Sequence, residues 1–187
     1  QPWDNRLPGV TQDRFYVPYQ RHNTWWEDST GFWTSLARSS YLMRQGHAVA
    51  DILYDLGSDT PLKIATWRMR PAPPAGYDYD VCGDEVLLNR ASVKDGRIVL
   101  PDGMSYRLLI LAGGNQMTLP AARQLRTLIN AGANVLGQIK PAGSPSLSDG
   151  AAGGEEVRRI ADELWGKGLL PATGEHQTRA VRMLCGM

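Results

Sequence analysis

The residues with the clearest chemical capacity lie near the start of the sequence, in a stretch rich in aromatic and hydrogen-bonding side chains. Indole rings can stack on the apolar C–H face of a ring-shaped ligand, while Arg, His and Asn side chains hydrogen-bond its hydroxyl groups. This combination favours a neutral, hydroxyl-rich ligand such as a sugar. The candidate binding residues are Trp3, Arg21, His22, Asn23 and Trp25.

These candidates also have structural interpretations. Trp25 and Trp26 are adjacent and point in different directions, so they could wedge two parts of the chain together. Aromatic side chains serve hydrophobic cores more often than binding sites, and a single histidine such as His22 is more often structural. For the two tryptophans, ligand contact and structural packing both stay open.

Acidic residues in the same stretch could do acid–base chemistry only if two of them face each other. The available carboxylates are Asp4, Asp13, Glu27 and Asp28, and the sequence does not pair them. Glu27 is the catalytic candidate among them. We favour the alternative that its carboxylate stabilises the first turn of the following helix through the helix dipole.

Motifs for a nucleophile or a metal are weak in the rest of the sequence. Cys82 and Cys185 lack metal-ligand spacing, and Cys82 has neither a strand-to-helix elbow nor a histidine signature. Gly113-Gly114-Asn115 follows a predicted strand, where open α/β sheets bind ligands, but two glycines favour a plain loop. The aspartates of Tyr77-Asp78-Tyr79-Asp80 are expected to cap turns rather than bind calcium. No cofactor can therefore be identified in this chain.

Composition and charge exclude several classes of partner. The 187 residues are 42% hydrophobic and 21% charged, which is typical of a globular protein of one or two domains. A net charge of +1 gives no long-range field that would attract nucleic acid or an anionic membrane. No apolar run approaches the ~20 residues that a membrane span needs. Because the sequence opens with Gln1, we expect a cut made inside a longer chain.

The first 46 residues are predicted to be a separate piece from the rest. Aromatic residues and turn formers are concentrated in the first 33 positions, which is typical of a long structured loop. Apolar residues from Ser29 to Gln45 then recur at helical spacing, with Asp28 or Ser29 as the cap and Gly46 at the end. We place a domain boundary between Gly46 and His47.

Residues 47 to 166 have the pattern of an α/β domain. Apolar runs at 48–54, 106–111 and 133–139 predict buried strands, and the residues between 58 and 80 are too rich in proline for regular structure. Helices are predicted at 80–89, 119–131 and 155–165, and a hairpin turns at Asp95-Gly96. Together they predict a doubly wound, flavodoxin-like parallel sheet with helices on both faces.

Many ordered motifs of the sequence resemble glycoside hydrolase family 106, the α-L-rhamnosidases. They span roughly residues 1 to 166, whereas residues 167–187 depart from the family pattern and are interpreted as a divergent tail. Chance is an improbable source of so many motifs in order. The motifs include Gln1-Pro2-Trp3, Asn23-Thr24-Trp25-Trp26-Glu27, Pro74-Ala75-Gly76-Tyr77-Asp78-Tyr79-Asp80, Ser92-Val93-Lys94-Asp95-Gly96-Arg97 and Leu100-Pro101-Asp102-Gly103-Met104-Ser105-Tyr106.

The resemblance implies a fragment of an enzyme that removes terminal rhamnose from glycans or glycosides. Residues 1–46 would be the last loop and helix of a (β/α)8 catalytic barrel, followed by a domain resembling the glutamine-amidotransferase fold. It also implies an inverting mechanism, with two carboxyl groups roughly 6.5 to 9.5 Å apart. We expect the catalytic pair upstream of Gln1, in the missing barrel of the same polypeptide, so the isolated chain should be inactive.

By the same resemblance, calcium could be present in the full-length enzyme, and the enzyme would be periplasmic or extracellular. The competing hypothesis is a non-catalytic module that gives structural support, binds carbohydrate or mediates oligomerisation. A free-standing flavodoxin-like cofactor protein is disfavoured, because Asp55-Leu56-Gly57-Ser58-Asp59 is too acidic to cradle a phosphate.

Overall fold

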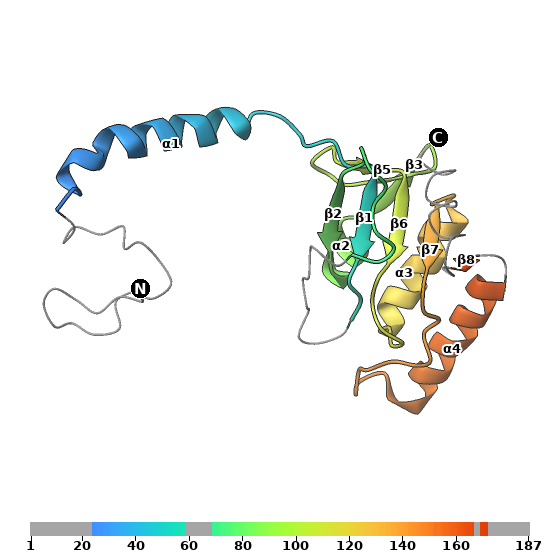
Figure 1. Ribbon diagram of the computed structural model, residues 1–187. Coiled ribbons are helices and arrows are strands. Elements are labelled where there is room, and N and C mark those ends of the chain that lie inside the picture. Colours follow the sequence, from blue (N-terminus) through green and yellow to red (C-terminus); the bar gives the residue numbers. More distant parts are fainter. Residues whose placement is uncertain (1–23, 59–68, 167–168, 172–187) are drawn as a thin grey trace, which may run out of the picture. The chain divides into compact units, whose positions relative to one another are not determined.

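A computed structural model of the chain describes residues 24–58, 69–166 and 169–171. The chain divides into two compact units, an N-terminal unit of residues 1–47 and a sheet unit of residues 48–187 (Figure 1). The division falls next to the boundary placed between Gly46 and His47. The assignment of the first segment to a catalytic barrel stays a prediction.

The described part of the N-terminal unit is one helical segment. A short 3-10 helix, η1 (Glu27–Ser29), leads directly into α1 (Thr30–Met43), as the helical spacing predicted. The predicted cap at Ser29 is wrong, because Ser29 already has helical φ and ψ and its side chain makes no cap hydrogen bond. Its hydroxyl donates back to the carbonyl of Trp26 at 2.5 Å. No residue of α1 is buried.

The sheet unit contains a five-stranded parallel sheet, which confirms the predicted fold class. Its strands lie in the order β2-β1-β6-β7-β8, and every neighbouring pair is parallel. Counted along the chain this is the order 2-1-3-4-5 of flavodoxin-like sheets. The strands are β1 (Ile52–Asp55), β2 (Tyr79–Cys82), β6 (Leu108–Leu111), β7 (Val135–Gly137) and β8 (Leu170–Pro171).

Two edge strands were not predicted from the sequence. The helix expected at 80–89 is instead β2, which pairs with β1, followed by the shorter helix α2 (Asp84–Asn89). The strand β8 pairs with β7, so the segment interpreted as a divergent tail begins inside the sheet. Both strands are short edge strands with one neighbour each, and the sequence around them lacks the long apolar run of a central strand.

The predicted hairpin is confirmed as part of a second, three-stranded sheet. The strands β3 (Ser92–Lys94), β4 (Arg97–Val99) and β5 (Ser105–Tyr106) are antiparallel neighbours. Asp95 and Gly96 join the first two strands with φ of 52° and 74°, the left-handed conformation that a two-residue hairpin turn needs. The predicted strand 106–111 is therefore shared between β5 and β6.

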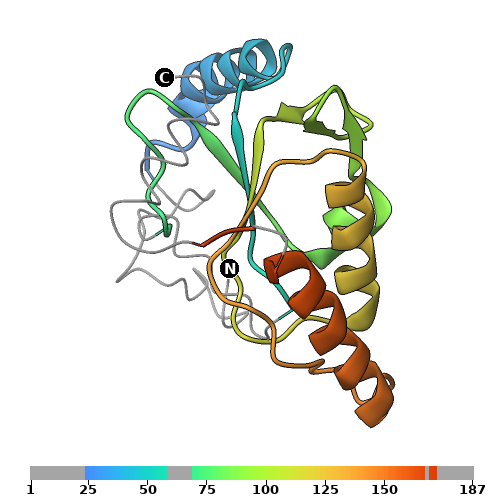
Figure 2. The ribbon, with the colours of Figure 1, turned by 90° about the vertical axis from the view of Figure 1, so that its right-hand side faces the viewer.

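The helices α2, α3 (Leu119–Asn130) and α4 (Gly150–Gly166) pack on one face of the parallel sheet (Figure 2). Leu53 and Leu109 point into this layer, whereas Tyr54 and Ile110 belong to a second cluster on the opposite face. No described helix contributes to that second cluster. A helix on this face was also predicted, and the connection from β1 to β2 includes residues 59–68, which lie outside the described residues.

The contact between α4 and the sheet requires one glycine. A Cβ atom added at Gly137, the last residue of β7, would lie 2.5 Å from the ring of Trp165. That separation is far below van der Waals contact, so the indole occupies the space that a side chain at this strand position would fill. Gly132 follows the end of α3 with φ of 97°, the left-handed conformation that commonly terminates a helix.

Candidate functional site

The segment that carries the predicted sugar-binding residues forms an aromatic cluster at the start of α1. The rings of Trp26 and Trp33 have centroids 6.0 Å apart, and Phe32 meets Trp33 edge-on at 5.0 Å. The indole N–H of Trp33 donates to the Ser29 hydroxyl at 2.9 Å. These contacts fix Trp26 and Trp33 against the helix, which is a structural role for the second of the two adjacent tryptophans.

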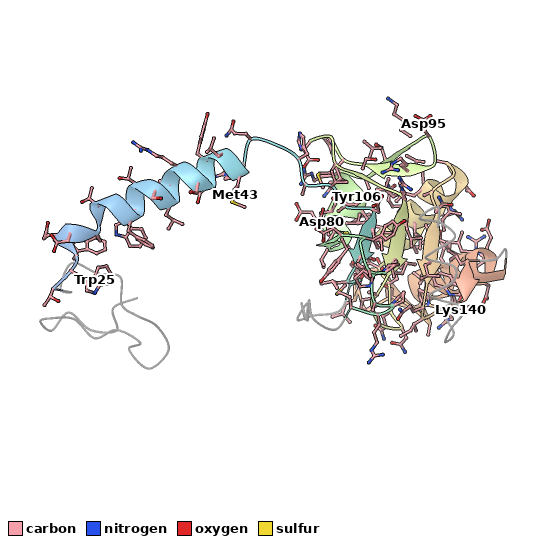
Figure 3. All side chains as sticks on the ribbon, turned by 45° about the horizontal axis from the view of Figure 1, so that its top comes forward. Trp25, Met43, Asp80, Asp95, Tyr106 and Lys140 are labelled. Atoms are coloured by element: carbon pink, nitrogen blue, oxygen red, sulfur yellow. The ribbon has the colours of Figure 1, made fainter. Side chains whose placement is uncertain are left out.

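Trp25 is the predicted binding residue that the structure describes. Its side chain lies at the start of the helix and is 38% exposed (Figure 3). Trp3, Arg21, His22 and Asn23 lie outside the described residues, so their proximity to Trp25 stays a prediction. Glu27 is exposed in the first turn of η1, and its catalytic and helix-stabilising interpretations likewise stay predictions.

A second group of polar residues lies at the carboxyl end of the parallel sheet, between β1 and β6. In sheets of this order, β1 and the third strand form the switch point where ligands bind. Asp55 ends β1 and is 1% exposed, and its Oδ1 accepts the backbone N–H of Gly57 at 3.2 Å. Burial, reinforced by the charge of Asp84, raises the pKa of Asp55 to about 7, against the opposing effect of the Gly57 hydrogen bond.

Three loops meet above Asp55 through a set of hydrogen bonds. The Ser58 hydroxyl donates to the Asp84 carboxylate at the start of α2, and the same carboxylate oxygen accepts the Thr118 hydroxyl at 3.3 Å. The Thr118 backbone N–H donates to Ser58 Oγ at 3.1 Å. We call Ser58, Asp84 and Thr118 the carboxyl-edge junction, because they connect the segments that follow β1, β2 and β6.

The junction is reinforced by a backbone contact between two glycines. A Cβ atom at Gly113 would lie 2.9 Å from the Cα of Gly57, and one at Gly57 would lie 3.0 Å from the Cα of Gly113. Gly57 also has φ of 76°. The loops after β1 and β6 therefore touch at the point where ligand-binding sheets have a crevice. This contact gives Gly113, the first glycine of Gly113-Gly114-Asn115, a packing role.

Cys82 lies beside this group but is not a nucleophile in this environment. Its Cα is paired with that of Asp55 in the β1–β2 register, and the residue is 8% exposed. Burial, followed by the charges of Asp55, Asp84 and Asp80, raises the pKa of its thiol. Because the thiolate is the reactive form of cysteine, these effects keep Cys82 protonated and inert.

The acidic motif 77–80 is used in internal hydrogen bonds. Asp78 Oδ1 accepts the backbone N–H of Tyr79 at 2.8 Å, and Asp80 Oδ2 accepts the Tyr106 hydroxyl at 2.9 Å (Figure 3). Across the described ranges, no three His, Cys, Asp or Glu side chains are grouped as metal ligands. The described helices also include none that is long and apolar enough to cross a membrane.

Sequence reasoning missed the carboxyl-edge junction. Ser58 and Asp84 are 26 positions apart, and Ser58 and Thr118 are 60 apart, so only the parallel register brings them together. One signal was available, because Asp55 is an acidic residue at the end of the apolar run 48–54. A charge in that position of a buried strand needs a structural or functional reason.

Comparison with known proteins places these features in a family. Residues 1–185 match the sequence profile of glycoside hydrolase family 106, described as alpha-L-rhamnosidase. The match continues through the segment that was expected to depart from the family pattern. A protein of Formosa agariphila that carries the provisional name beta-glucuronidase is 35% identical over 170 residues, which cover 91% of this chain and 14% of that protein.

A solved structure gives the same relationship at the level of the fold. The rhamnosidase from Novosphingobium sp. PP1Y matches with a TM-score of 0.71 and 26% sequence identity, over 97% of this chain. The matched part is 18% of the rhamnosidase chain. The present chain thus spans a small fraction of the length of both of these relatives.

Proposed function

We propose that this chain, which belongs to glycoside hydrolase family 106, is part of an α-L-rhamnosidase. The whole enzyme would hydrolyse terminal α-L-rhamnosyl residues of glycans or glycosides. The observation that carries the proposal is the family match over residues 1–185. The likeness to a solved rhamnosidase over 97% of the chain supports it. The reaction would be an inverting hydrolysis with a general acid and a general base on opposite sides of the sugar.

The catalytic carboxylates would lie in the part of the enzyme that this chain does not include. The chain matches 14% and 18% of the lengths of the two relatives described above, which leaves ample length for a catalytic barrel. On this proposal the N-terminal unit contributes Trp25 and its neighbours to the rim of the sugar site. If the whole enzyme holds calcium, the described residues supply no cluster that fits it, and the ligands would come from elsewhere.

The exposed apolar side of α1 supports a missing partner of this kind. Phe32, Leu36 and Met43 are 53%, 47% and 85% exposed, and helical spacing puts them on one side of the helix. A helix of 14 residues is marginal in water unless an amphipathic face is packed. We infer that this face packs against the preceding barrel of the same polypeptide.

The sheet unit fits a supporting role better than a second activity. The switch point is closed by the Gly57–Gly113 contact, and the thiol of Cys82 is held protonated. These observations favour the alternative of a non-catalytic module for this unit, within or beside the enzyme. The two hypotheses differ in whether the N-terminal unit contacts sugar.

Calorimetric titration of the 187-residue chain with L-rhamnose, alongside hydrolysis of an aryl α-L-rhamnoside, tests the proposal. We expect weak binding that is lost in Trp25→Ala and kept in Tyr41→Ala, an exposed aromatic residue at the far end of α1. We expect no turnover. Hydrolysis by the chain alone would show that the catalytic pair lies within it, and absence of binding would leave the structural alternative.

A further inference from the structure

The carboxyl-edge junction closes over a buried acid. The Asp55 side chain accepts a hydrogen bond from the Gly57 N–H, and Asp55 lies directly before the loop that carries Ser58. The half-buried Asp84 carboxylate uses Oδ2 for both Ser58 and Thr118. Its Oδ1 is buried and finds no hydrogen-bond partner among the residues that the structure describes. Two carboxyl groups are thus enclosed under one set of loops.

Among the residues that the structure describes, no positively charged side chain acts on Asp55. Asp84 on α2 is the charged group that acts on Asp55, and Cys82 lies opposite it on β2. Asp80, two residues before Cys82 on β2, accepts a hydrogen bond from the Tyr106 hydroxyl. The segment after β6, residues 112–118, contains no ionisable side chain. An ionised Asp55 in the closed junction is therefore both desolvated and repelled.

We propose that the carboxyl-edge junction is a conformational latch, which stays closed over the switch point while Asp55 is protonated and loosens when Asp55 ionises. Loosening admits water to the Asp55 carboxylate by moving the loop 56–58 away from Asp84 and Thr118. Because Gly57 touches Gly113 through backbone atoms, this loop cannot shift without separating from the loop after β6. The latch is a property of the sheet unit and does not depend on the proposed hydrolase function.

The direction of the pH response follows from linkage. A carboxyl group that is more basic in the closed state binds its proton preferentially there, so protonation favours closure. Burial and the charge of Asp84 raise the pKa of Asp55 to about 7 in the closed state. The latch is then tight at mildly acidic pH, and it weakens as the pH rises from the ordinary aspartate range through about 7.

Cys82 provides an internal reporter of the opening. It lies opposite Asp55 in the strand register, and its carbonyl accepts the N–H of Leu56, the first residue of the loop 56–58, at 3.0 Å. The residue is 8% exposed, so we expect a reagent to reach its thiol only when this corner opens. The full chain carrying Cys185→Ser has Cys82 as its single thiol.

The experiment measures the rate at which a neutral maleimide labels Cys82 between pH 5.5 and 8, divided by the rate for free N-acetylcysteine at the same pH. In the Cys185→Ser chain we expect the normalised rate to rise about ten-fold or more. With Asp55→Asn added, it should stay flat within about two-fold. Equal pH profiles with and without Asp55, or a flat profile in the parent, would overturn the proposal.

A second variant keeps the test decisive if Asp55→Asn does not fold. Asp84→Asn retains an oxygen that can accept the Ser58 and Thr118 hydrogen bonds but removes the neighbouring charge. We expect it to move the rise in the normalised labelling rate to lower pH. Amide exchange supplies the control, because local opening should leave Gly57 and Thr118 less protected than the amides within α4, which exchange through global unfolding, at every pH. Equal protection in both regions would mean that the junction opens only by global unfolding and would overturn the latch.

Discussion

The N-terminal helix and the parallel sheet place similar apolar residues in opposite surroundings. Leu36 on α1 is 47% exposed, whereas Leu109 on β6 is fully buried. The sheet unit buries its apolar residues against its own helices, while none of α1 is buried. The sheet unit therefore carries its own hydrophobic core, whereas α1 has no buried residue.

The largest effect that tests this comparison is the loss of one core leucine. Leu109→Ala should lower the free energy of unfolding by about 2–5 kcal/mol, because it removes buried methyl groups and leaves a cavity. The same change at Leu36 should alter it by less than about 0.5 kcal/mol. Urea denaturation, followed by circular dichroism, measures both. A comparable loss at Leu36 would mean that α1 packs within this chain.

The buried acid of the sheet unit predicts a pH-dependent stability. The raised pKa of Asp55, about 7, means that the folded state binds its proton more tightly than the unfolded state, so the stability of the chain falls as pH rises from about 4 to 7. Asp55→Asn removes this dependence. We expect the variant to gain about 2–3 kcal/mol relative to the parent chain between pH 5 and pH 8.

Denaturation curves at the two pH values measure this gain. At each pH, the free energy of unfolding of the parent is subtracted from that of the variant. The change in this difference between pH 5 and pH 8 tests the prediction, since the Asn side chain itself can shift the stability equally at both pH values. Asp51, a partly exposed aspartate paired with Arg107 at 2.9 Å, supplies a matched Asp→Asn control. A gain of the same size in that control would contradict the assignment to Asp55.

The contact between Gly57 and Gly113 predicts a smaller loss. Gly113→Ala places a methyl group 2.9 Å from the Gly57 Cα, and overpacking of this kind costs typically about 1–3 kcal/mol. Gly166→Ala, at the end of α4, meets no atom within 4 Å and should be neutral. Thermal unfolding of both variants separates the steric effect from the general effect of replacing glycine.

The smallest effect concerns the cap of α3. Asp149 accepts the Leu119 N–H at 3.1 Å and the Ser144 hydroxyl, and these hydrogen bonds lower its pKa. The ionised Asp149 side chain contributes to the free energy of unfolding above the ordinary aspartate pKa, and this contribution is lost as the pH falls through the lowered pKa. Asp149→Ala should therefore reduce the melting temperature slightly at pH 6 and less at pH 3. The exposed Glu155, replaced by Ala, is the control.

The central elements could be predicted because their signals are local. Apolar runs marked β1, β6 and β7, and Asp95-Gly96 marked the hairpin turn, since strand burial and turn geometry depend on neighbouring residues. The sequence predicts a helix where β2 lies, because Tyr79-Asp80-Val81-Cys82 is short, half polar and separated from α2 by a single residue. Its identity depends on pairing with β1, which a single segment does not encode.

The site could be predicted only in part, for the same reason. Thr118 directly precedes α3, yet its hydroxyl donates to Asp84, while Asp149, 30 positions from Leu119, accepts the Leu119 N–H. Such exchanges of partners depend on how the loops meet in three dimensions. The sugar-binding residues were chosen for their chemistry alone, and apart from Trp25 they lie outside the described residues.

The packing of the Trp165 ring against Gly137 limits how this sequence can diverge. An indole whose ring lies 2.5 Å from a would-be Cβ makes the two positions interdependent, so a lineage that acquires a side chain at 137 must first shrink residue 165. If the side chain at 137 is gained first, the intermediate sequence cannot pack α4 against the sheet. We expect homologues with a larger residue at 137 to carry a smaller one at 165, and Gly137→Ala to be tolerated only together with a change such as Trp165→Leu.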